Sequence, residues 1–70
     1  MPQIPISLTD EELRLLINIL ADRFSSGVNP GIARPCHGFY VKIRSAAAAH
    51  GIPLPRDDAL ALEFLEQALR

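Results

Sequence analysis

The sequence predicts an all-α fold, a compact three-helix domain with an extended N-terminal arm. In three stretches apolar residues recur at the three- and four-residue spacing of a helix, and prolines and glycines separate these stretches. Hydrophobic residues make up 49% of the 70 residues, so the chain can build one small core and one domain at most. The predicted helices cover about residues 10–26, 36–50 and 56–69.

The start of the first helix carries the clearest local signal. Two prolines keep the arm, Met1–Ser7, out of a helix, so we expect it to be extended. Thr9 is followed three residues later by Glu12, the spacing of a capping box in which each side chain bonds the other residue's backbone N–H. Gly27 is expected to end this helix as its left-handed cap.

The second and third helices are bounded by proline and glycine. The second is expected to start near Pro35–His37 and to end at His50, because Gly51 follows. Residues 39–44 also alternate partly as a strand would, but the rest of the chain offers no strand partner of similar length, which favours a helix. Pro55 opens the third helix, with acidic residues in its first turn.

Charge is divided along the chain. From Arg23 to Arg56 there are five cations and no acidic residue, whereas each flanking segment has four acidic residues and one cation. The overall net charge of −1 therefore hides a basic middle between two acidic ends. Such a division of charge affects which partners the protein binds rather than which fold it adopts.

Two helices have more apolar surface than one core requires. Leu15 and Ile19 lie outside the expected core stripe of the first helix, and Leu62 lies at the edge of a wide apolar arc on the third. They are either scattered exposed aliphatic residues or a contact surface. Apolar surface in excess of what the core requires, on two helices, favours a homodimer or a hydrophobic partner. The expected core stripe of the first helix is Leu13, Leu16, Ile17, Leu20, Ala21 and Phe24.

The second helix is more polar. Phe39, Ile43 and Ala46 point one way, and Tyr40 and Arg44 share the opposite face, which we expect to be exposed. An aromatic and an arginine on one exposed face are typical of interface hot spots; the alternative is an ordinary solvated face. The predicted partner-binding residues are Leu15, Ile19, Arg34, His37, Tyr40, Arg44 and Leu62.

No residue pattern predicts a catalytic or metal site. Cys36 and His37 are adjacent and His50 is distant, whereas structural zinc sites need four ligands at close, repeated spacing. Cys36 also lacks the positioned base that a nucleophile needs. Asp57 and Asp58 are interpreted as cap and first-turn charge. We therefore expect no enzyme, no metal and no cofactor.

The sequence thus predicts a small non-enzymatic protein-binding module (an adaptor, inhibitor or assembly factor), homodimeric, with a protein partner of acidic charge. The alternative is a nucleic-acid-binding protein that uses the basic segment 23–56; the isoelectric point near 6.0 argues against it.

Lack of a signal peptide, of a membrane span and of paired cysteines predicts a soluble, cytoplasmic protein. Phages and mobile elements often encode proteins of this class, so such an origin is a further expectation.

Overall fold

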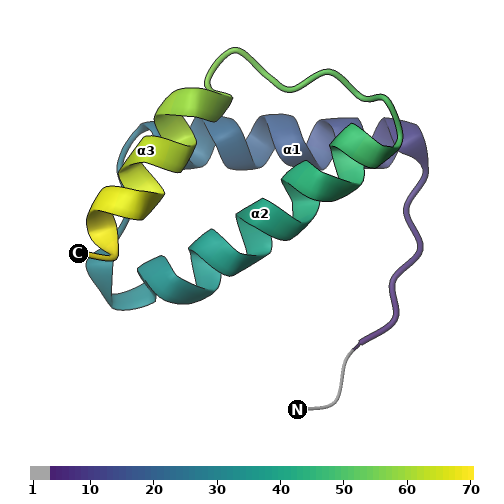
Figure 1. Ribbon diagram of the computed structural model, residues 1–70. Coiled ribbons are helices and arrows are strands. Elements are labelled where there is room, and N and C mark those ends of the chain that lie inside the picture. Colours follow the sequence, from purple (N-terminus) through teal and green to yellow (C-terminus); the bar gives the residue numbers. More distant parts are fainter. Residues whose placement is uncertain (1–3) are drawn as a thin grey trace.

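The computed structural model describes residues 4–70 and confirms the all-α prediction. Its elements are α1 (Asp10–Ser25), the short 3-10 helix η1 (Pro30–Ile32), α2 (Ala33–Ala49) and α3 (Asp58–Ala68). Residues 4–9 form an extended arm that leaves the start of α1 and runs away from the helices (Figure 1). The first three residues of the predicted arm lie outside the described part of the chain.

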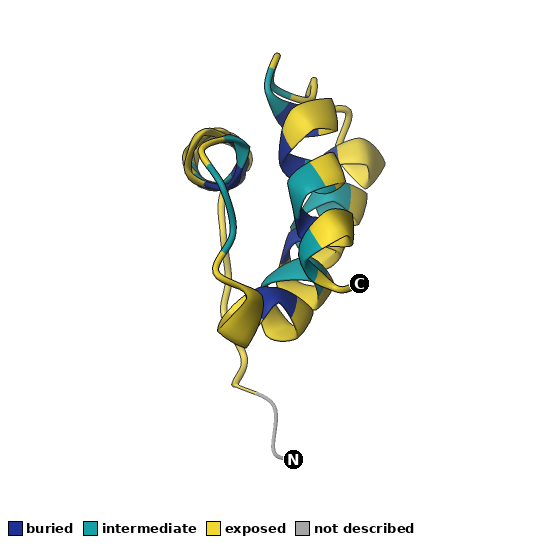
Figure 2. Ribbon diagram, turned by 90° about the vertical axis from the view of Figure 1, so that its left-hand side faces the viewer, coloured by how far each residue is buried: buried dark blue, intermediate teal, exposed yellow. Residues whose placement is uncertain are grey.

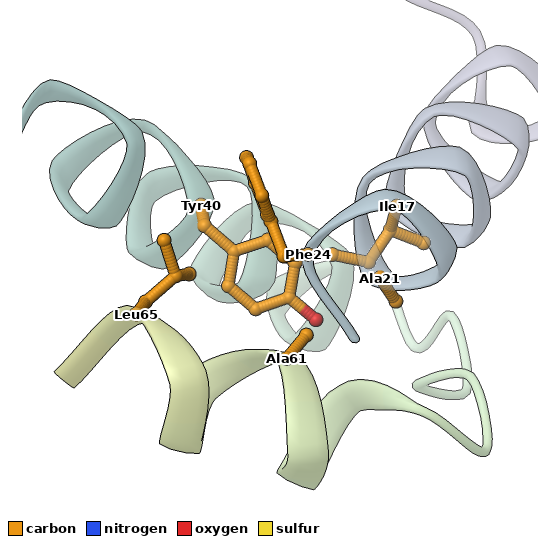
Figure 3. Packing of buried hydrophobic residues seen from close by; sticks show 6 residues of the cluster. All are labelled: Ile17, Ala21, Phe24, Tyr40, Ala61 and Leu65. Carbon is orange, nitrogen blue, oxygen red and sulfur yellow. The ribbon is translucent and has the colours of Figure 1, made fainter. Parts of the chain in front are cut away.

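The three helices enclose one core. Seen along α1, this helix lies on one side and α2 and α3 lie on the other (Figure 2). The rings of Phe24 and Tyr40 meet edge to face, with 5.7 Å between their centroids and 87° between their planes. A smaller cluster joins the start of α1 to the end of α2 through Leu13, Ala47 and Ile52. The main cluster consists of Ile17, Ala21, Phe24, Tyr40, Ala61 and Leu65 (Figure 3).

The predicted capping box is confirmed at the start of α1. The Thr9 N–H donates to Glu12 Oε1 at 2.9 Å, and the Glu12 N–H donates to Thr9 Oγ1 at 3.1 Å. These hydrogen bonds, the one from the Thr9 backbone first, lower the pKa of Glu12. At the other end of α1, Gly27 has a φ of 124° and its N–H donates to the Phe24 carbonyl, as expected for the cap.

The helix interpretation of residues 39–44 is confirmed, but the predicted start of α2 is wrong by three residues. The Asn29 side chain accepts a 2.9 Å hydrogen bond from the Gly31 N–H and opens η1, which leads directly into α2 at Ala33. Pro35 therefore lies inside the first turn. A proline is tolerated there because first-turn N–H groups have no acceptor within the helix.

The end of α2 is fixed by a Schellman motif. Gly51 has a φ of 70°, its N–H donates to the Ala48 carbonyl, and the Ile52 N–H donates to the Ala47 carbonyl at 2.8 Å. Ile52 is buried, so the motif also turns the connecting segment back onto the core. The chain then reaches α3, which begins at Asp58 rather than at the predicted residue 56.

Candidate functional site

The face of α2 that meets the core differs from the predicted one. Tyr40 is fully buried, whereas Phe39 is 46% exposed, so the prediction that Tyr40 lies on an exposed face is wrong. The physical reason is that the Tyr40 hydroxyl has a buried partner, and a paired hydroxyl can be buried at little cost while the ring fills the core. Among the described residues, every buried side-chain polar atom has a hydrogen-bond partner.

The partner of Tyr40 is Asp58, the first residue of α3. The Tyr40 hydroxyl donates to Asp58 Oδ1 at 2.5 Å. Arg44, one turn after Tyr40 on α2, donates from Nε to Oδ1 at 2.9 Å and from Nη2 to Oδ2 at 2.9 Å. Asp58 is only 6% exposed, so this network of three side chains joins α2 to α3 at the edge of the core.

The network keeps all three groups in their ordinary charge states at neutral pH. Burial alone raises the pKa of Asp58, but the hydrogen bonds from Arg44 and Tyr40 and the charge of Arg44 outweigh it, and the pKa lies below its usual value. Burial, the hydrogen bond to Asp58 and the charge of that carboxylate raise the pKa of Tyr40 far above its usual value. The result is an ionised acid, a charged arginine and a neutral phenol, which suits a structural contact.

The predicted basic contact surface is therefore smaller than the sequence suggests. The Arg44 guanidinium is committed to Asp58, and only about a third of its side chain (34%) is exposed. His37 is half-buried. Of the predicted basic residues Arg34 remains exposed, and Lys42, two helical turns further along the same outer side of α2, is exposed as well.

The predicted apolar contact residues of α1 are exposed as expected. Leu15 is 61% and Ile19 is 54% exposed, and they lie one turn apart on the side of α1 opposite its buried residues. An open hollow of about 510 Å³ adjoins Leu15. It is lined by Glu11, Glu12, Arg14, Leu15 and Asn18.

Leu62 does not join this surface. It is half-buried and packs against the main core cluster from α3, so part of its apolar area is already used within the molecule. The structure therefore brings Leu15 and Ile19 together but separates them from Leu62 and from Arg34.

Cys36 and His50, the other two candidate metal ligands or reactive groups, make contacts within the fold. Cys36 is half-buried and packs against the main core cluster. His50 Nδ1 lies 3.3 Å from Asp10 Oδ1, which brings the end of α2 to the start of α1. Within residues 4–70 no three His, Cys, Asp or Glu side chains gather closely enough to hold a metal ion.

Sequence reasoning missed the network of Tyr40, Arg44 and Asp58. Asp58 was correctly expected in the first turn of a helix, but its carboxylate faces α2 rather than serving as a cap. A tyrosine and an arginine one turn apart on the same helix share a face, and this spacing could have indicated that both act on one acceptor.

Comparison with protein families, with curated proteins and with solved structures gives no match. A function therefore has to be inferred from the surface of the chain itself. Two features stand out there, the outer face of α1 around Leu15 and Ile19 and the basic outer face of α2 around Arg34 and Lys42. Across residues 4–70, every helix is too short or too polar to cross a membrane.

Proposed function

We propose that this chain is a small non-enzymatic protein-binding module of the cytoplasm, acting as an adaptor, inhibitor or assembly factor. The observation that carries the proposal is the pair Leu15 and Ile19, which are more than half exposed, adjacent, and directed away from the core. Single exposed aliphatic residues are normal on a protein surface, but here two of them lie one turn apart, and one of them, Leu15, lines an open hollow.

The energetics favour use of this pair as an anchor. Full burial of a leucine or isoleucine side chain contributes about 1.5–3 kcal/mol relative to exposure. Leu15 and Ile19 can thus supply several kcal/mol to a contact, while Glu11 and Asp22 on the same side provide a polar rim. The same exposed apolar area also supports self-association of the chain, with a homodimer as the smallest assembly.

The basic side of α2 supports a second contact. Arg34 and Lys42 are exposed, and no acidic residue lies on α2 to neutralise them. An acidic protein partner would complement this charge, which would affect the rate and selectivity of encounter more than the affinity.

The same two cations favour nucleic acid binding as the second candidate function. This candidate is weaker than the sequence suggested, because Tyr40 cannot stack on a base while it is buried and the Arg44 charge is offset by Asp58. It would rest on Arg34 and Lys42, with half-buried His37 three residues after Arg34 on the helix.

Affinity capture from host lysate tests the proposal, using wild type, Leu15→Glu and the control Leu60→Glu. Leu60 is also an exposed leucine but lies on α3, outside the proposed surface. We expect wild type and Leu60→Glu to retain the same protein partner with or without nuclease, and Leu15→Glu to lose it. Equal capture by all three proteins would contradict the proposal, and capture that disappears with nuclease would favour nucleic acid.

A further inference from the structure

The outer faces of α1 and α2 carry opposite charge. On α1, Glu11, Glu12 and Asp22 surround Leu15 and Ile19, with Arg14 and Arg23 at the margins. The acidic residues outnumber the basic ones on this face by three to two.

On α2 the outer face has only positive charge. Arg34, Val41 and Lys42 are all exposed there, and the whole helix contains no acidic residue. On the same side Gly38 has no side chain and Ser45 has a short one, so both positions leave room for larger side chains of a partner.

The two faces point to opposite sides of the molecule. The buried residues of α1 face α2 and α3, so its outer face is turned away from both. The outer face of α2 is turned away from α1 in the same way, on the other side of the core (Figure 2).

We propose that the chain associates head to tail, with the outer face of α2 in one copy docked on the outer face of α1 in the next. Leu15 and Ile19 then pack against Val41 and its short neighbours, and Arg34 and Lys42 meet the acidic rim. Pairing α1 with α1 would set two net-acidic faces together, and pairing α2 with α2 would set cations against cations. The proposal rests on the self-association included in the proposed function and specifies its geometry.

This geometry has a consequence that a two-fold dimer lacks. Because each copy uses two different faces on opposite sides, every complex still has one free face of each kind and can add further copies. The average mass should therefore keep rising with concentration instead of stopping at twice the 7.7 kDa of one chain.

A mixing experiment with Ile19→Glu and Lys42→Glu tests the proposal by sedimentation. Both residues are exposed, so both variants should keep the fold, which circular dichroism checks. Each variant alone should be monomeric, because each lacks one of the two faces. Their equimolar mixture should form a complex of two chains and nothing larger, since it can build one intact interface.

The other outcomes would overturn the head-to-tail arrangement. A Lys42→Glu protein that associates like wild type, or a mixture that stays monomeric, would exclude it, and so would a wild-type protein that is monomeric at millimolar concentration. Ala59→Glu on α3 is the control for added negative charge and should associate like wild type. Partner capture through Leu15 is measured separately, so a monomeric wild type that still captures its partner would refute this geometry but not the proposed function.

Discussion

Arg44 and Asp58 form a two-point ion pair that ties the middle of α2 to the first residue of α3. Nε of Arg44 lies 2.9 Å from one carboxylate oxygen and Nη2 lies 2.9 Å from the other. The Tyr40 hydroxyl binds the same carboxylate from the core side. Residues that look like a binding surface in the sequence therefore serve to position α3.

Replacing Tyr40 by phenylalanine should lower stability without changing the fold. The ring still packs edge to face on Phe24, but Asp58 loses one of its hydrogen-bond donors inside the protein. Hydrogen bonds to charged groups contribute about 1.5–3 kcal/mol, and we expect a loss of this size in urea denaturation. Equal free energies of unfolding for Tyr40→Phe and wild type would mean that the hydroxyl contact does not contribute.

Stability should fall in acid because of Asp58. The pKa of this carboxyl is lower in the folded state than in the unfolded chain, so the unfolded state binds more protons as the pH falls. The contribution of Asp58 is complete above the unfolded value of about 3.9 and is lost as the pH drops through the folded value. Denaturation curves between about pH 6 and pH 2 should show a steeper decline for wild type than for Asp58→Asn. Parallel declines would indicate that other carboxyl groups cause the acid sensitivity.

Reversing the charge of Arg44 should destabilise the protein far more than reversing that of Arg34. Arg44→Glu places a carboxylate beside buried Asp58 and removes its counter-charge. Breaking a buried pair costs about 3–5 kcal/mol, and the lower end applies because part of Arg44 is exposed. Arg34→Glu changes an exposed side chain and should leave the thermal midpoint nearly unchanged.

Circular dichroism melts of these two variants provide the comparison. Similar midpoints for Arg44→Glu and Arg34→Glu would contradict the structural role of Arg44. The comparison of the two variants also shows which one suits binding studies. Only the Arg34→Glu protein should remain folded while its basic face is altered.

Removing the cap of α1 should have a local and measurable cost. Thr9→Ala leaves the Glu12 N–H without its acceptor, and losing an N-cap typically costs about 0.5–2 kcal/mol. Thr9→Asp keeps an acceptor oxygen and should retain most of the stability. A thermal midpoint that is the same for Thr9→Ala and wild type would argue against the capping box as a stabilising element.

The helices could be predicted because their signals are local. Thr9 and Glu12 fix the start of α1, and Gly51 fixes the end of α2, through backbone geometry within a few residues. The predicted start of α2 is three residues late because proline favours the first position of a helix, whereas Pro35 lies later in the first turn. Exposure of Leu15 and Ile19 also followed from helical spacing alone.

The orientation of α2 could not be predicted in the same way. Spacing assigns residues to faces, but it does not say which of two mixed faces meets the core when each contains one aromatic residue. That choice depends on a contact between Tyr40 and Asp58, which are 18 residues apart and on different helices. A buried polar network of this kind is a tertiary feature: α2 alone shows that Tyr40 and Arg44 are one turn apart, but it does not show the acceptor that they share.

The central claim is that copies of this chain associate through the outer face of α1, and a concentration series of amide resonances tests it most directly. From micromolar to millimolar protein, we expect the signals of Leu15 and Ile19 to shift together with those of Arg34 and Lys42. Tyr40, in the core, should not change. Resonances of Leu15 and Ile19 that stay constant while others shift, or that stay constant at every concentration, would contradict self-association through α1.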